Sequence, residues 1–138
     1  MRESILAEFL SGEVTAALLQ IELANVVGAN TLQAGENMIL DLSYDLEIRR
    51  DHLIRLCETF LKGDLDSGQL EAIAFFLIGS DHFVWNSDLK EGELVAEILF
   101  DWSAPEINYV LTEQNVSRYL AGLQEGRYPF PSKPSQAR

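Results

Sequence analysis

The first 104 residues of the chain contain no proline, and this limits most strongly what the chain can fold into. A proline inside a helix removes a hydrogen bond and clashes with the preceding turn, so a long segment without proline is typical of a helical body. Through most of this segment the apolar residues also recur three or four positions apart, which is the spacing of one helix face. The two observations together predict a protein built mainly from amphipathic helices.

The apolar spacing divides the chain into helical segments. It predicts helices over residues 3–10, 14–24, 43–62, 66–78, 92–102 and 112–126. Residues 29–42 give no clear pattern. The only strand signal of note is at residues 107–111, just after Pro105, and it also fits an extended connection. The fold class expected from the sequence is therefore an all-α bundle of five or six helices, with at most one short extended segment near 107–111.

Residues that favour helix ends support these limits. Asp66 with Gln69 has the spacing of a capping box, and Thr112 can cap the last helix. Ser43 is placed to cap the helix over residues 43–62. Gly63 and Gly126 are placed to end helices.

Length predicts one domain. A chain of 138 residues can bury a core without disulfides or metals, and its single cysteine, Cys57, lies among apolar residues as a buried thiol would. Residues 1–126 are expected to form the helical domain and residues 127–138, which contain three prolines, an irregular tail. The chain start lacks the features of a signal peptide, and no apolar stretch is long enough to span a membrane. A cytoplasmic location is therefore expected.

The sequence contains no constellation that indicates catalysis. It has two histidines, His52 and His82, whereas a zinc site needs three or four converging ligands. It contains no H-E-x-x-H motif, no glycine-rich phosphate loop and no G-x-S-x-G elbow. We therefore predict a protein that is not an enzyme and that has no catalytic residue, no metal and no cofactor.

The charge of the chain is large and unevenly distributed. The net charge is −12, and residues 63–117 carry eleven acidic residues against one base, Lys90, a net −10. Such a surface is repelled by nucleic acid and by anionic membranes. The expected partner is a basic protein, with no direct contact to nucleic acid or membrane.

One predicted helix concentrates this charge. Glu93, Glu97 and Asp101 are four residues apart, opposite the apolar face of the helix, and no base within the helix relieves them. Clustered charge of one sign can steer a partner, although a solvated face that aids solubility is the simpler alternative. The predicted partner-binding residues are these acids and the acids, histidine and aromatic side chains near them in sequence: Asp81, His82, Trp85, Asp88, Glu91, Glu93, Glu97, Asp101, Glu106 and Tyr109.

Part of the chain resembles a known class of protein. Residues 80–85 (SDHFVW), 99–109 (LFDWSAPEINY), 111–112 (LT) and 115–116 (NV) are similar to segments of bacterial immunity proteins of contact-dependent growth inhibition and other polymorphic toxin systems. The likeness covers residues 60–126, and the first half of the chain only loosely resembles the helical colicin D type. The resemblance implies a protein that binds a cognate toxin domain and neutralises it in the cell that makes both. Many such toxins are nucleases with basic clefts.

Two functions remain open from the sequence. An immunity protein that occludes a basic toxin active site accounts for the charge, the size and the missing motifs. A small acidic helical adaptor or regulatory subunit also fits the helices, but it leaves the uneven charge unexplained. A neighbouring gene that ends in a basic nuclease-like domain would favour the first.

Overall fold

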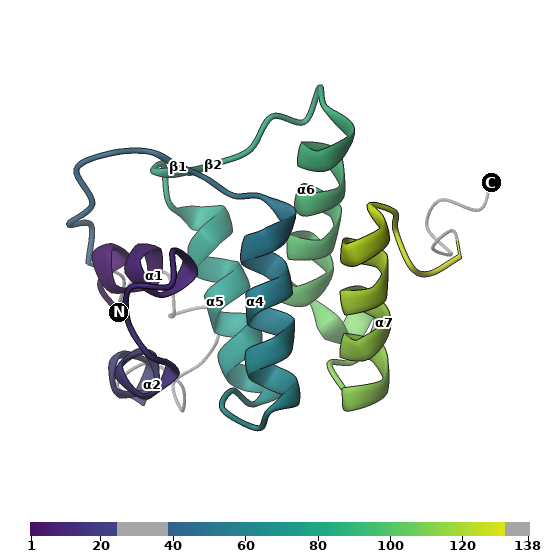
Figure 1. Ribbon diagram of the computed structural model, residues 1–138, viewed down its shortest axis with the longest axis horizontal. Coiled ribbons are helices and arrows are strands. Elements are labelled where there is room, and N and C mark those ends of the chain that lie inside the picture. Colours follow the sequence, from purple (N-terminus) through teal and green to yellow (C-terminus); the bar gives the residue numbers. More distant parts are fainter. Residues whose placement is uncertain (25–38, 132–138) are drawn as a thin grey trace.

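The computed structural model describes residues 1–24 and 39–131, and helices make up most of both ranges (Figure 1). The α-helices are α1 (Glu3–Leu10), α2 (Ala16–Ala24), α4 (Arg50–Leu61), α5 (Ser67–Gly79), α6 (Lys90–Ser103) and α7 (Glu113–Glu125). Two short strands, β1 (Leu46–Glu47) and β2 (Phe83–Val84), and a 3₁₀ helix, η2 (Pro105–Ile107), complete the elements. The predicted all-α bundle with a short extended segment is confirmed.

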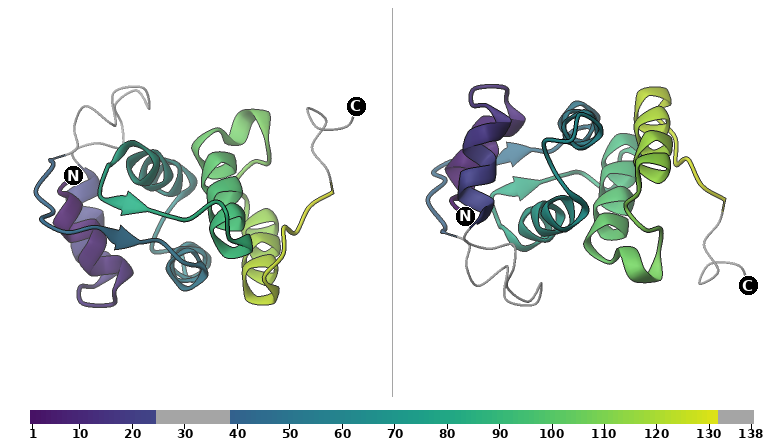
Figure 2. Two further views of the ribbon diagram at one scale, coloured as in Figure 1. Left: turned by 90° about the horizontal axis from the view of Figure 1, so that it is seen from above. Right: turned by 90° about the horizontal axis from the view of Figure 1, so that it is seen from below.

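Helices α4, α5, α6 and α7 form the body of the bundle. Their axes are nearly parallel, and the chain direction alternates from each helix to the next (Figure 1). Helix α4 packs along α7, and α5 packs along α6. Helices α1 and α2 lie across one side of this body, as both views of Figure 2 show. The described C-terminal residues lie on the opposite side (Figure 1).

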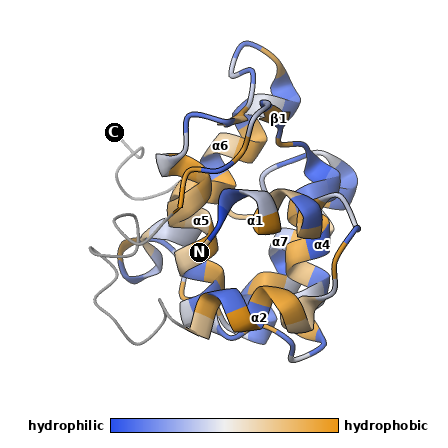
Figure 3. Cartoon of the chain, turned by 90° about the vertical axis from the view of Figure 1, so that its left-hand side faces the viewer, coloured by the Kyte–Doolittle hydropathy of each residue, from blue (hydrophilic) through white to orange (hydrophobic). Residues whose placement is uncertain are grey.

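The core runs through the whole bundle. Its largest fully buried side chains include Phe9, Phe76, Trp102 and Tyr119. Trp102 lies on the inner face of α6, as its spacing from Leu94 and Ile98 indicated. Most helices carry hydrophobic and hydrophilic residues on different sides, which Figure 3 shows as orange and blue stretches on the same ribbon.

The structure corrects the start of the long helix predicted over residues 43–62. Helix α4 begins at Arg50, because residues 46–47 pair as a parallel strand with β2, in the register Leu46 to Phe83 and Glu47 to Val84. Ser43 is therefore not a helix cap. The strands of the described residues lie here and not at residues 107–111, where the 3₁₀ turn η2 is followed by an irregular connection.

Other predicted helix ends are confirmed. The Asp66 carboxylate accepts a hydrogen bond from Gln69 N at 2.8 Å, and the Gln69 side chain accepts one from Asp66 N at 2.9 Å. Thr112 accepts from Asn115 N at 3.1 Å. Gly126 follows α7 with a φ of 77°, a left-handed conformation that glycine adopts without strain. The unassigned residues 29–38 lie outside the described ranges.

Residues 127–131, called here the C-terminal segment, are part of the folded body up to Phe130. The Phe130 ring is 7% exposed and stacks on Tyr109 with 3.8 Å between ring centroids. Arg118 lies 4.3 Å from the centre of the same ring and donates to Pro129 O at 3.2 Å. A Cβ on Gly122 would lie 2.6 Å from Arg127 O, so the close approach of the segment to α7 requires glycine there. Residues 127–130 therefore have no helix or strand, and they pack against the helical body.

Candidate partner-binding surface

The ten predicted partner-binding residues do not form one continuous surface. Four are exposed (Asp81, Asp88, Glu93, Glu106), five are half-buried (His82, Trp85, Glu91, Glu97, Tyr109) and one, Asp101, is fully buried. Residues 81–93 lie around the strands and the start of α6, whereas Glu106 and Tyr109 follow its far end (Figure 1). The length of α6, about 20 Å at 1.5 Å per residue, separates the two groups.

Asp101 is not part of an outward acidic row, which corrects the prediction from its spacing. Each step of four residues turns about 40° further around a helix of 3.6 residues per turn. Two such steps from Glu93 bring Asp101 to the edge of the apolar face, where its exposure is 0%. Its carboxylate is therefore covered by the fold and is not accessible to a partner.

Two tyrosine hydroxyls satisfy the buried Asp101 carboxylate. Tyr119 of α7 donates to Oδ2 at 2.9 Å, and Tyr128 of the C-terminal segment donates to the same oxygen at 2.6 Å. Burial, together with the nearby Asp101 charge, raises the pKa of both phenols well above the ordinary tyrosine value. The carboxylate therefore links α6, α7 and the C-terminal segment, a structural role.

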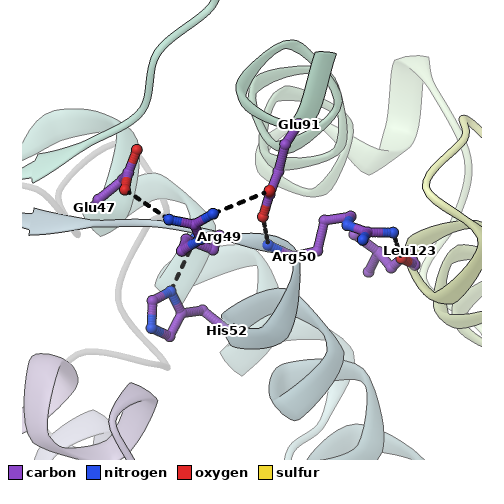
Figure 4. A network of polar contacts seen from close by, with 6 residues as sticks. All are labelled: Glu47, Arg49, Arg50, His52, Glu91 and Leu123. Atoms are coloured by element: carbon purple, nitrogen blue, oxygen red, sulfur yellow. Dashed lines mark hydrogen bonds and ion pairs between the residues drawn. The ribbon is translucent and has the colours of Figure 1, made fainter. Parts of the chain in front are cut away.

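Glu91 also serves the fold, as Figure 4 shows. Its carboxylate accepts a hydrogen bond from Arg50 N at 3.0 Å, at the first residue of α4, and lies 3.4 Å from the Arg49 guanidinium. The backbone hydrogen bond and the two arginine charges lower its pKa. An anion at a helix N-terminus is favoured by the helix dipole. The Arg50 guanidinium in turn donates to Leu123 O at 2.9 Å, which fastens α4 to α7.

The start of α4 has a second side-chain contact, from His52. His52 Nδ1 accepts a hydrogen bond from Arg49 N at 2.9 Å, so the imidazole satisfies the backbone N–H of the residue that precedes α4 (Figure 4). Its partial burial is the main cause that lowers its pKa. His82 instead lies 3.0 Å from the Asp45 carboxylate, with 37% of its side chain exposed.

The two aromatic candidates in loops pack largely against the body. Trp85 is half-buried against the core, and Tyr109 is held by the stacked Phe130 ring. Neither protrudes as a free anchor. The bases are also closer to the acids than the sequence indicated, since Lys90 and Arg127 line the same groove as Glu93 and Glu97.

What remains of the predicted acidic surface is a set of exposed carboxylates. Asp81, Asp88, Glu93 and Glu106 form no ion pair with any residue in the described part of the chain. They lie at the approach to α6, on its outer side and just after its end. Their charges are available to a partner.

Three apolar side chains at and after the end of α6 are exposed, which the sequence did not indicate. Phe100 is 52% exposed, Ile107 80% and Val110 61%. A helical wheel could have found Phe100, because it lies three residues after Glu97 and seven after Glu93 and so shares their face of α6. For Ile107 and Val110, which lie in an irregular connection, no periodic signal exists.

Within residues 1–24 and 39–131, no three His, Cys, Asp or Glu side chains are grouped so that they could hold a metal ion. In the same ranges, no helix combines the length and the apolar character needed to cross a membrane. Cys57 is completely buried, and burial raises the pKa of its thiol far above the usual value.

Comparison with known proteins gives no further guidance to the family. No family model matches the chain, and no curated protein or solved structure gives a significant match.

Proposed function

We propose that this protein is an immunity protein, which binds a cognate toxin domain with a basic surface and neutralises it by covering the toxin's active site. In this proposal both proteins meet in the cytoplasm of the cell that makes them, and the toxin domain is a nuclease. The proposal is supported by the sequence resemblance over residues 80–85 and 99–109 and by the net charge of −12.

One observation carries the proposal from the structure. Asp81, Asp88, Glu93 and Glu106 are exposed and have no ion-pair partner among the described residues. By contrast, the Asp101 carboxylate is buried and hydrogen-bonded to two tyrosines, and the Glu91 carboxylate is bound by Arg49 and Arg50. Only Glu93 of the four exposed acids lies on α6, but unpaired like charges on one surface repel each other, and a basic surface would relieve that repulsion. The same charges would raise the rate of encounter with a basic partner.

The buried polar groups support binding over catalysis. Glu3, which is 0% exposed, accepts a hydrogen bond from Leu42 N at 3.2 Å and another from the Ser80 hydroxyl. Asp101 is held by two tyrosines. These hydrogen bonds explain why Glu3 and Asp101 can be buried, namely because both carboxylates stabilise the fold. A catalytic role is not needed to account for them.

The test is survival of cells that express the toxin domain encoded beside the gene. Co-expressed wild-type protein should protect the cells. The variant Glu93→Lys with Glu106→Lys should lose protection. The matched control, Glu13→Lys with Glu58→Lys, makes the same change in charge at two exposed acids outside residues 63–117 and should protect fully. Helical circular dichroism spectra of all three proteins check that they fold.

Two results would count against the proposal. If the wild type protects against no neighbouring toxin domain, the immunity function fails and an adaptor function takes its place. If the folded Glu93/Glu106 variant protects as well as the control, these carboxylates are a solvated face without a role in binding.

A further inference from the structure

The last turn of α6 and the connection from α6 to α7 carry exposed apolar side chains that are not part of the core. Phe100, Ile107 and Val110 are each more than half exposed, and they lie within one end of the bundle; we call them the α6–α7 patch. Scattered exposed apolar residues are normal on a protein surface, whereas several at one end mark a candidate interaction surface.

The backbone that carries the patch is firmly held. The Asn108 side chain donates to Ala104 O at 2.9 Å, and the Asn115 side chain donates to Val110 O at 2.8 Å. Tyr109 is stacked on Phe130, and Leu111 is 4% exposed. The inward positions are thus occupied by Tyr109 and Leu111, which leaves Val110 between them directed outward.

Such fixed display matters for binding. A side chain already held in its bound position loses less conformational freedom when a partner covers it. The C-terminal segment contributes to this order, because Phe130 packs on Tyr109 at 3.8 Å. The patch is therefore a prearranged surface, and no flexible loop has to fold onto the partner.

Acidic residues border the patch and indicate the chemistry of its partner. Glu97 lies one helical turn before Phe100, Glu93 lies two turns before it, and Glu106 directly precedes Ile107. Protein interfaces commonly place an apolar centre within a polar rim, and the centre provides most of the affinity. A partner that fits has the complementary pattern, an apolar recess surrounded by lysine and arginine.

We propose that the α6–α7 patch is the apolar anchor of the complex, and that it seats in an apolar recess with a basic rim on the toxin domain. This inference rests on the proposed function, whose partner it describes further. The acids then govern how fast the complex forms, and the patch governs how slowly it dissociates.

The first experiment measures binding to the toxin domain encoded beside the gene, in a catalytically inactive form. The variant Phe100→Ser, Ile107→Ser and Val110→Ser should bind about 100-fold more weakly, mostly through faster dissociation. The control variant Ile21→Ser, Leu40→Ser and Tyr44→Ser also removes three exposed apolar side chains, but at sites away from this end, and should bind within about threefold of the wild type. Equal melting temperatures show that the variants are folded.

A second experiment tests the patch without the toxin. Two synthetic peptides of equal charge are added to isotope-labelled protein, one with leucine and lysine at helical spacing and one with serine in place of leucine. The leucine peptide should shift the amide resonances of residues 100–110 at a concentration at which the serine peptide does not. The triple patch variant should abolish that difference.

The outcomes separate the two proposals. If the wild type does not bind the toxin domain, the proposed function fails and the peptide experiment alone decides on the patch. If the wild type binds and the triple patch variant binds equally well, the anchor is disproved and the function stands. Equal binding of both peptides also disproves the anchor, as does a wild-type dimer that the patch variant converts to a monomer.

Discussion

The Tyr128 hydroxyl donates a hydrogen bond to Asp101 Oδ2 at 2.6 Å, and this contact joins the C-terminal segment to α6. The same oxygen accepts a hydrogen bond from the Tyr119 hydroxyl at 2.9 Å, so one carboxylate oxygen binds two phenols from different parts of the chain. An isolated charge in a protein interior is costly, and each donor reduces that cost. The stability of this end of the bundle should therefore depend on both tyrosines.

The tyrosine pair predicts a loss of stability in alkali. The folded state raises the pKa of Tyr119 and Tyr128 above the ordinary 10.0, so the unfolded chain releases these protons at lower pH than the folded protein. Stability contributed by the neutral phenols is full below about pH 10 and falls as the pH rises further. Well above pH 10, each phenol that stays protonated in the folded state should contribute up to about 1.4 kcal/mol per pH unit to this fall.

Urea unfolding between about pH 8 and pH 11 measures this slope. The double variant Tyr119→Phe with Tyr128→Phe should be less stable at neutral pH, because Asp101 loses two donors, and its stability should fall less steeply in alkali. Parallel curves for the wild type and the double variant would show that these phenols do not couple to folding.

Phe130 should contribute to stability although it follows the last helix. Its ring is 7% exposed and packs on Tyr109 and Tyr119. The substitution Phe130→Ala should lower the free energy of unfolding by about 3 kcal/mol, the usual cost of removing a buried ring. Phe100→Ala, at a position 52% exposed, is the matched control and should cost less than about 1 kcal/mol. Equal losses in urea unfolding would mean that the C-terminal segment does not stay docked.

Glu91 should matter for stability, and Glu93 should not. Glu91→Gln removes the anion at the start of α4 and should cost about 1 kcal/mol at neutral pH. The pKa of Glu91 is lowered in the folded state, so its contribution is present above the ordinary value of 4.5 and is lost as the pH falls through the lower folded value. The wild type and Glu91→Gln should then converge in acid. Glu93→Gln, at an exposed position, should match the wild type at every pH in thermal melts. If the difference between the wild type and Glu91→Gln persists in acid, the charge of Glu91 is not its cause.

Local signals predicted much of this fold. Helices α1, α5, α6 and α7 lie close to where the apolar spacing placed them, because that spacing is local to each segment, and α5 and α7 also carry cap residues in their own sequence. The Asp66–Gln69 capping box is an example of information that lies within four residues. Such features need no knowledge of the tertiary structure.

The predictions that failed depend on distant partners. Helix α4 starts late because residues 46–47 pair with Phe83 and Val84, and because Glu91, 41 positions away, caps Arg50 N. Asp101 is buried because Tyr128 reaches it from the C-terminal segment. The helical spacing brings Asp101 to the edge of the apolar face, but no residue near it in the sequence shows that Tyr119 and Tyr128 cover it.

The same limit applies to the surface. The uneven charge of residues 63–117 was visible in the sequence, but which carboxylates are exposed was not. Glu3 illustrates this outside the acidic stretch, since a charge at the chain start is expected to be solvated and is instead 0% exposed beneath Leu42 and Ser80. Control substitutions for charge must therefore avoid Glu3, whereas Glu13 and Glu58 are exposed and suitable.

The last prediction concerns how the exposed acids act. If Glu93 and Glu106 steer a basic toxin domain, association of the wild type should slow as salt rises, since the Debye length falls from about 10 Å at 0.1 M to about 3 Å at 1 M. Glu93→Lys with Glu106→Lys should associate at least about tenfold more slowly at low salt and show a weaker salt dependence, because it has exchanged attraction for repulsion. Its dissociation rate should change much less, since exposed rim charges affect encounter more than residence.

Stopped-flow mixing with the inactive toxin domain measures both rates, and the Glu13→Lys with Glu58→Lys protein controls for the change in net charge. That control lowers the total negative charge by the same amount as Glu93→Lys with Glu106→Lys. If the position of the acids decides steering, the control should slow association only slightly. Equal slowing in the two variants would assign steering to the net charge of −12 as a whole and remove any special role for the outer side of α6. An association rate of the wild type that does not change with salt would remove electrostatic steering altogether.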